Sequence, residues 1–223
     1  MNLFICIDDT DDLDSIGTGE LLENMRDAAA AQGLGEGGFI VRYQLLIDDA
    51  IPYTSHNSSM CCTFRTDDRN ALTAFCRAYL ETHCADGSDP GLCILTDDPA
   101  VDCAPLAAFG ADVSLSEHGG TGDGVIGALA GAGLRAGKAE GKIKGKLYPL
   151  PDRPVMTAED FTALYGVGQI VDDAGQPVDP STALHFTEPT KALFRDGKVT
   201  CVVVREDGVL KPQPKRKKEK RHV

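Results

Sequence analysis

A run of four aspartates near the start of the chain is the densest group of side chains that could do chemistry. The run is Ile7-Asp8-Asp9-Thr10-Asp11-Asp12, and it follows an apolar stretch, Leu3 to Ile7, that predicts a short buried strand. Carboxylates this close repel one another unless a cation neutralises them, and hard oxygen ligands suit Mg²⁺, which commonly arrives with nucleotide phosphates. The run therefore indicates a magnesium site at the end of a strand, with a solvated acidic loop as the alternative.

A helix is predicted to begin at Thr18, directly after the aspartates. Glu20 and the pair Leu21-Leu22 open an amphipathic pattern that continues to Ala31. The free N–H groups and the positive dipole end at a helix N-terminus attract anions, so the same corner is suited to a phosphate. The alternative is that Thr18 or Ser15 only caps the helix.

The second notable stretch is rich in glycine. It is His118-Gly119-Gly120-Thr121-Gly122-Asp123-Gly124, and it leads into a run of small residues from Val125 to Leu134. A glycine-rich turn that enters a helix lets backbone N–H groups approach a phosphate closely. The stretch is neither a Walker motif nor a clean G-x-G-x-x-G. Phosphate binding and tight helix packing are equally good interpretations of these glycines.

The elements that must position these residues follow the order strand, helix, strand, strand, helix, strand. Strands are predicted at Leu3 to Ile7 and at 39–46, 59–64 and 91–95, and helices at 18–31 and 67–84. This order predicts an α+β, ferredoxin-like split βαβ sheet with a glycine-rich loop and helix as an extension. Right-handed crossovers would place the first strand inside the sheet, with the aspartates at the middle of one edge.

The remainder of the chain is expected to form a small β-rich appendage. Strand-like runs occur at 168–171, 183–186 and 199–205, and a short helix start is predicted at Thr157 to Asp160. We expect a nucleotide-binding domain at 1–147, a β-rich domain at 148–210 and a disordered basic tail at 211–223.

Charge and cysteine content narrow the class of protein. The net charge is −12; residues 211–223 carry seven Lys or Arg and one Glu, which leaves −18 for residues 1–210. A body this acidic repels a nucleic-acid backbone, whereas the basic tail is suited to phosphate contact. Eight cysteines occur without a C-x-x-C pair or a secretory signal, so we expect reduced, packed cysteines in a cytoplasmic protein with no membrane contact.

Three segments together resemble one family. Ile7 to Asp11, Ile51 to Asn57 and Gly122 to Ala130 are similar, in this order, to segments of the archaeal agmatinylcytidine synthetases, which modify the anticodon wobble cytidine of an isoleucine tRNA. The resemblance covers about residues 3–134. The chain departs from the family pattern in lacking a cysteine-rich zinc ribbon and in carrying Thr54, Ser55 and His56 in place of basic residues.

The resemblance implies an ATP site with magnesium. Asp8, Asp9 and Asp11 match the metal and phosphate residues of the family, and Thr18 matches a threonine that accepts a phosphoryl group, which makes Thr18 and Asp8 the catalytic candidates. The nucleotide-binding candidates are Thr10, Asn57, His118, Gly119, Gly120, Gly122 and Gly124.

The sequence thus predicts an ATP-dependent transferase or ligase-like enzyme that moves a phosphoryl or nucleotidyl group to an unknown acceptor. One alternative is a non-catalytic module that senses a nucleotide or anion or binds a protein partner. Another is a tRNA-modifying subunit whose RNA-binding parts are supplied in trans, and a homo-oligomer is left open. Further candidates are His56, a basic strip at Lys138, Lys142, Lys144 and Lys146, and the pair Asp97-Asp98.

Overall fold

The computed structural model describes residues 1–47, 57–97, 105 and 122–213. The chain divides into two compact units, Met1–Lys144 and Gly145–Val223. Each unit is treated by itself. Both contain strands and a helix, so the predicted α+β class is confirmed.

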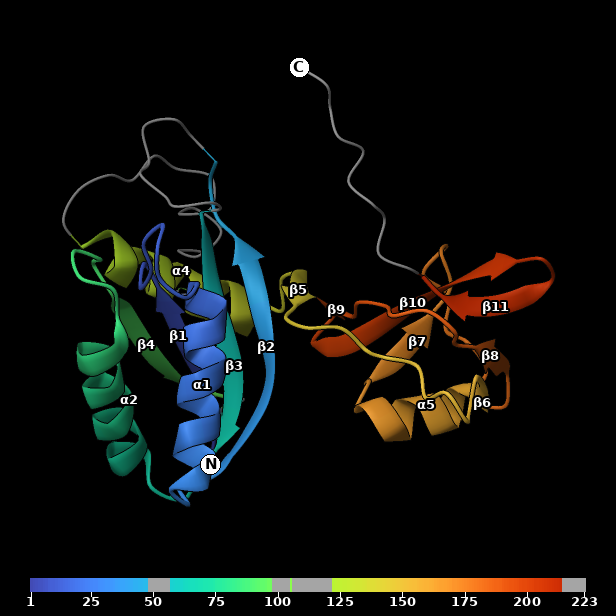
Figure 1. Cartoon of the computed structure of the whole chain (residues 1–223), viewed down its shortest axis with the longest axis horizontal. Helices are drawn as coiled ribbons and strands as arrows, with labels where there is room; N and C mark the ends of the chain where they lie inside the picture. The colour runs from blue at the N-terminus through green and yellow to red at the C-terminus, as the bar shows by residue number, and fades with distance from the viewer. Residues whose placement is uncertain (48–56, 98–104, 106–121, 214–223) are drawn as a thin grey trace. The chain divides into compact units, whose positions relative to one another are not determined.

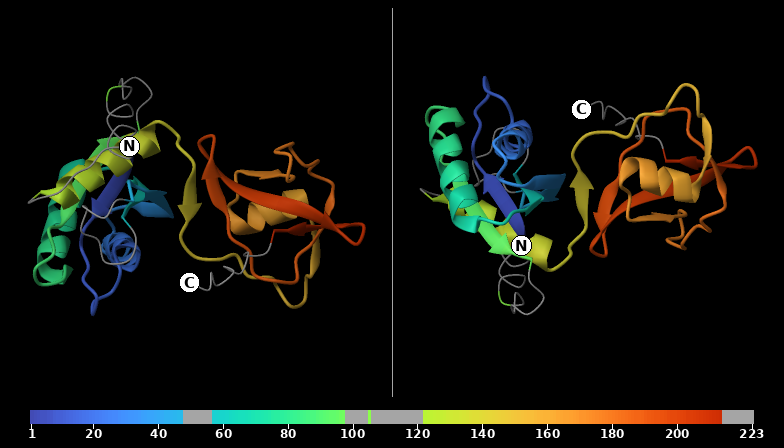
Figure 2. Two further views of the ribbon diagram at one scale, coloured as in Figure 1. Left: turned by 90° about the horizontal axis from the view of Figure 1, so that it is seen from above. Right: turned by 90° about the horizontal axis from the view of Figure 1, so that it is seen from below.

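The first unit is a twisted antiparallel sheet covered by helices on both faces. Its strands pair in the order β4-β1-β3-β2-β5, which places β1 inside the sheet as expected. Helices α1 and α2 cover one face and α4 covers the other, as Figures 1 and 2 show. The elements are β1 (Asn2–Asp8), α1 (Thr18–Ala31), β2 (Glu36–Gln44), β3 (Ser58–Arg65), α2 (Arg69–His83), β4 (Gly91–Thr96), α4 (Asp123–Ala136) and β5 (Gly141–Ile143).

Strand alternation divides β1 between the two faces of the sheet. Leu3, Ile5 and Ile7 pack into the core under α1 and α2, as the apolar pattern requires. Residues at even positions, from Phe4 to Asp8, therefore face α4. Asp8 is the last residue of β1, so the predicted position of the aspartates at the end of an interior strand is confirmed.

The glycines at 33–38 do more than end α1. Strand β2 begins at Glu36, three residues before the predicted start, and Gly37 and Gly38 lie inside it. A Cβ on Gly37 would lie 2.2 Å from Arg26 Cγ, and one on Gly38 would lie 2.2 Å from Thr63 Oγ1. The register of β2 against β3 also shifts between Gly37 and Ile40, as at a β-bulge.

The second unit is β-rich with one helix against its sheet among the described residues (Figure 1). Strand β10 pairs with β9, β11 and, in parallel, β7, while β8 pairs with β11 and β6. Phe161 and Phe186 are central in its core. The elements are β6 (Val155–Thr157), α5 (Ala158–Tyr165), β7 (Gln169–Val171), β8 (Ala183–His185), β9 (Leu193–Arg195), β10 (Lys198–Glu206) and β11 (Val209–Pro212).

The predicted start of the disordered tail at residue 211 is wrong. Lys211 and Pro212 belong to β11 and pair with Val204 and Val203 of β10, and the Gln213 N–H donates to the Val202 carbonyl over 2.8 Å. The backbone groups of these residues are therefore held in the sheet. The rest of the tail lies outside the described residues. Among the described helices, none is both long and apolar enough to span a bilayer.

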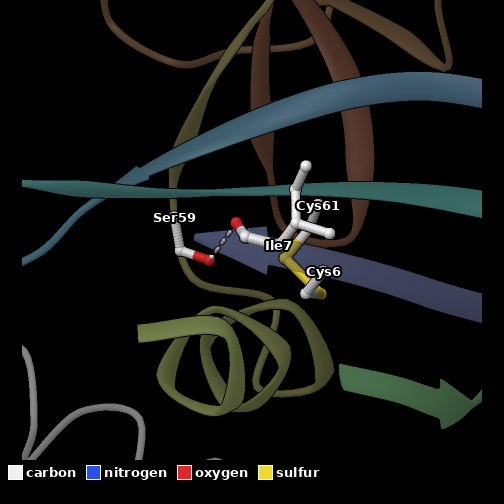
Figure 3. The surroundings of a disulfide bond; sticks show 4 residues. All are labelled: Cys6, Ile7, Ser59 and Cys61. Atoms are coloured by element: carbon white, nitrogen blue, oxygen red, sulfur yellow. Dashed lines mark hydrogen bonds between the residues drawn. A yellow bond between two sulfur atoms is a disulfide. The ribbon is translucent and has the colours of Figure 1, made fainter. Parts of the chain in front are cut away.

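The expectation of reduced cysteines is wrong for one pair, whereas Cys62, Cys76, Cys84, Cys93 and Cys201 are free. Cys6 and Cys61 form a disulfide between β1 and β3, where they are register partners with a Cα–Cα distance of 4.1 Å (Figure 3). Both side chains are buried on the sheet face that α4 covers. Beside them the Ser59 hydroxyl donates to the Ile7 carbonyl over 3.3 Å.

This disulfide predicts a specific labelling pattern. When the protein is unfolded without reductant, a thiol reagent should modify Cys62, Cys76, Cys84, Cys93 and Cys201, which are free, and should leave Cys6 and Cys61 unmodified. Peptide mass spectrometry should then detect one linked pair that separates on reduction. Full labelling of Cys6 and Cys61 before reduction would contradict the cross-link.

Candidate functional site

The candidate site lies where the end of β1 meets the first turns of α1 and α4. Asp8 Oδ1 accepts a hydrogen bond from the Asp9 N–H over 3.0 Å, and Asp9 adopts a left-handed φ of 48°. Such a backbone conformation is uncommon for a residue other than glycine, and it turns the chain sharply out of the strand. The aspartates are therefore presented on a tight turn and not along an extended loop.

Helix α4 buries the Asp8 carboxylate. A Cβ on Gly127 would lie 1.8 Å from Asp8 Oδ2, so only glycine at this position lets the helix come so near. Burial raises the pKa of Asp8 to about 7, and the negative charges of Asp9 and Asp11 add to the increase, against a lowering by the Asp9 N–H. A carboxyl group whose pKa is raised this far by burial is typical of functional sites.

Asp11 contacts the first turn of α1. Its Oδ1 accepts a hydrogen bond from Thr18 Oγ1 over 3.2 Å, and its Oδ2 lies 3.4 Å from the Thr18 N–H. The N-cap residue, Gly17, has no side chain to cap the helix, so Asp11 supplies a capping carboxylate from seven residues earlier. Thr18 is 7% exposed. Thr18 therefore does not cap the helix with its own side chain; the cap is the Asp11 carboxylate, which contacts Thr18.

Asp89 belongs to the site and was missed by sequence reasoning. The pKa of Asp9 is raised mainly by burial and then by the negative charge of Asp89. The charges of Asp11 and Asp123 act in the same direction. Asp89 Oδ2 also accepts a hydrogen bond from the Gly122 N–H at the start of α4. The only local signal was the Asp89-Pro90-Gly91 turn before a strand, which by itself indicates nothing about Asp9.

Thr10 has a buried hydroxyl with no partner. The residue is 1% exposed, and among the described residues its Oγ1 has no hydrogen-bond partner, although its carbonyl accepts from the Ala85 N–H over 3.1 Å. Leaving a buried hydroxyl unsatisfied costs about 1–3 kcal/mol. A bound water or ligand oxygen would remove this cost.

Asn57 and Gly124 have structural contacts of their own. Asn57 Nδ2 donates to the Leu46 carbonyl over 2.7 Å, which closes the two ends of the segment between them. A Cβ on Gly124 would lie 1.9 Å from the Asp89 carbonyl oxygen, so this glycine allows close packing of α4 against the start of β4. Gly122, at φ 104°, is the N-cap of α4, and a Cβ there would meet no atom of the described residues within 4 Å.

Several candidates are not brought into this corner or cannot be placed. His118, Gly119, Gly120, His56 and Asp98 lie outside the described residues. Lys144 does lie beside the first turn of α1, where it forms an ion pair with Glu23, whereas Asp97 follows β4 at the far end of the sheet, where its N–H donates to the Asn2 carbonyl. Among the side chains that the structure describes, no three His, Cys, Asp or Glu converge closely enough to form a metal cluster.

The chain was compared with known proteins. No protein-family model matches it, and no curated protein matches it either. Solved structures that are similar include a tRNA fluorescent labelling enzyme, with 22% identity and a TM-score of 0.48 over 75% of this chain and 45% of that chain. The complex of TiaS with an isoleucine tRNA and ATP matches with 21% identity and a TM-score of 0.48, over 80% and 48% of the two chains.

Apo TiaS, an agmatidine synthetase that acts on an isoleucine tRNA, matches with 22% identity and a TM-score of 0.47 over 80% of this chain and 48% of that chain. TiaS is thus of the family that the sequence motifs resemble. The chain spans about half the length of these proteins. Function therefore has to be inferred from the site itself.

The raised pKa of Asp8 predicts how stability depends on pH in the metal-free protein. The folded state binds the Asp8 proton more tightly than the unfolded state, so stability falls as the pH rises from about 4 through about 7. Asp8→Asn removes this loss. In EDTA, the difference in unfolding free energy between the variant and the wild type should increase by about 2–3 kcal/mol between pH 5 and pH 8.

Denaturant titrations at these two pH values measure the effect. Asp14→Asn is the matched control, because Asp14 is exposed in the same loop, and its difference from the wild type should not change in this way. A difference for Asp8→Asn that does not depend on pH would contradict the burial of an ionisable Asp8.

Proposed function

We propose that the chain is a magnesium-dependent, ATP-binding enzyme that transfers a phosphoryl or nucleotidyl group to an acceptor. The observation that carries the proposal is an uncompensated buried carboxylate. Asp8 lies beside Asp9 and Asp11, and among the described residues no Lys, Arg or His forms an ion pair with any of the three. A buried charge without a partner is costly, and a divalent cation would remove the cost.

The donor set fits magnesium in one of its usual modes. Mg²⁺ commonly takes one or two protein carboxylates and completes its shell with phosphates and water, so it needs no preformed cluster of three side chains. One or two of the carboxylates of Asp8, Asp9 and Asp11 would hold it directly, and the ion would neutralise charge on the transferred phosphates. The Thr10 hydroxyl, which lacks a partner among the described residues, is suited to an oxygen of the same ligand.

Thr18 and Asp11 have the arrangement of a nucleophile and its base. The Thr18 hydroxyl already donates to the Asp11 carboxylate, so Asp11 would take its proton as that oxygen bonds to the γ-phosphorus of ATP and the bond from this phosphorus to the departing ADP breaks. The N-terminus of α1, where Thr18 lies, favours the negative charge of the phosphoryl group. This supports the assignment of Thr18 as the residue that carries phosphate.

The remaining assignments form part of the same proposal. Asn57, Gly122 and Gly124 would border the nucleotide together with His118, Gly119 and Gly120. The strand order β4-β1-β3-β2 with two helices on one face supports a ferredoxin-like domain at 1–147, followed by the β-rich domain at 148–210. We place the protein in the cytoplasm, and tRNA is kept as an alternative acceptor.

A non-catalytic nucleotide sensor is the second candidate, and one observation favours it. Thr18 is 7% exposed and engaged with Asp11, so its hydroxyl lies deep for a group that must react. A sensor would bind Mg·ATP without consuming it. Release of ADP or AMP on incubation with candidate acceptors separates the two functions.

Calorimetric titration of ATP tests the proposal directly. The wild type should bind ATP with Mg²⁺ and lose most affinity in EDTA, and Asp8→Asn should weaken the binding in Mg²⁺ at least about tenfold, because one charged ligand is lost. Asp14→Asn should bind as the wild type does. Normal affinity in Asp8→Asn, with the fold intact by circular dichroism, would remove Asp8 from the nucleotide site.

A further inference from the structure

The cations of the first unit include a small group that the proposed nucleotide site does not use. Residues 1–144 contain nine Lys or Arg and 23 Asp or Glu. Three of the nine lie on β2, on β5 or directly after β5, and we call Arg42, Lys142 and Lys144 the cationic strip. They come from separate parts of the sequence, since β2 and β5 are about one hundred residues apart.

Strand pairing places two cations directly opposite each other. Arg42 and Lys142 are register partners in the antiparallel pair of β2 and β5. Lys144 follows two residues later, and its N–H donates to the Ile40 carbonyl over 2.8 Å, so the ladder continues and Lys144 shares the face of Lys142. Like charges directly opposite each other on a sheet are destabilising. Packing alone therefore gives no reason for this pair.

The two opposed cations lack neutralising partners among the described residues. No carboxylate there forms an ion pair with Arg42 or Lys142, and the side-chain contact of Arg42 is a 3.5 Å approach of Nη2 to Gln44 Oε1. Lys144 differs, because Glu23 already pairs with it. The strip thus offers about two unneutralised positive charges, one of them a planar guanidinium that can bind an oxyanion with two hydrogen bonds.

The strip lies beside the first turn of α1. A Cβ on Gly19 would lie 3.4 Å from Lys144 Cε and 3.3 Å from Met60 Cε, and Met60 is the register partner of Arg42 on β3. Gly19 directly follows Thr18. The strip is therefore next to the residue assigned to carry phosphate, on the sheet face opposite to that of Asp8.

We propose that Arg42 and Lys142, assisted by Lys144, bind a phosphate group of the acceptor and hold it beside Thr18. This inference rests on the proposed function. A phosphate monoester carries about −1.5 to −2 charges at neutral pH, which matches the two unneutralised cations. A long polyanion would meet the surrounding carboxylates, so a small phosphorylated molecule fits better than a nucleic acid.

Inorganic phosphate is the probe for the test, with binding followed by NMR of the ¹⁵N-labelled full chain. The wild type should bind it in the millimolar range, and the double variant Arg42→Gln/Lys142→Gln should bind it at least about tenfold more weakly, as expected for loss of charge-assisted hydrogen bonds. Arg77→Gln, which removes an exposed cation of α2, is the control and should change the affinity less than about twofold. Because the like-charge pair is lost, the double variant should unfold at the same temperature as the wild type or a higher one.

Two comparisons decide the outcome. If phosphate binds equally well to Mg·ATP-saturated and free protein, the strip serves the acceptor; competition would assign it to the ATP phosphates and overturn the proposal. Unchanged phosphate affinity in the double variant, or no phosphate binding by wild type, would also overturn it. A chain that binds phosphate through the strip but does not bind Mg·ATP would support the strip and refute the proposed nucleotide function instead.

Discussion

The close approach of α4 to the sheet is the constraint on which the rest of the first unit depends. A Cβ on Gly91 would lie 1.7 Å from the Gly124 carbonyl oxygen, and one on Gly131 would lie 2.2 Å from Ser59 Oγ. No larger residue fits these places without moving backbone or a buried side chain. The backbone of α4, and not a layer of large side chains, forms the contact with β1, β3 and β4. This is why the helix consists of small residues.

This contact creates the chemistry of the corner. It removes Asp8 from water, which raises its pKa to about 7, and it covers the disulfide two residues earlier in β1. A protein selected only for stability would gain by placing an apolar residue at Asp8, because a buried carboxylate without a cation is costly. A cation bound at this corner would remove the cost of the buried Asp8 carboxylate, and this is the physical basis of the proposed magnesium site.

Local patterns were sufficient to predict the elements that position the site. The apolar run before Asp8 and the amphipathic period after Thr18 gave β1 and α1 nearly to the residue. Pairings between distant segments could not be predicted in this way. The Cys6–Cys61 disulfide depends on the register of β1 against β3, and the place of Asp89 depends on the packing of α4, neither of which leaves a periodic signal in the chain.

The roles of Gly122 and Gly124 also could not be predicted from local sequence. A glycine before a helix is compatible with phosphate binding and with close packing, and the sequence could not separate the two. The structure assigns Gly124 to packing by its distance to Asp89, whereas a Cβ on Gly122, which has a left-handed φ, would meet no described atom within 4 Å. Only a long-range neighbour distinguishes them.

The alternation of side chains along the strands finally explains why an acidic corner and a cationic strip can exist in one small unit. Asp8 faces α4, whereas Arg42 and Lys142 lie on the sheet face that α1 covers, so the sheet separates charges that would otherwise neutralise each other. The first turn of α1 is where the two meet: Asp11 contacts Thr18 and Lys144 approaches Gly19. In the proposed transfer, a metal-bound donor and a phosphorylated acceptor would each approach Thr18, which lies at this junction.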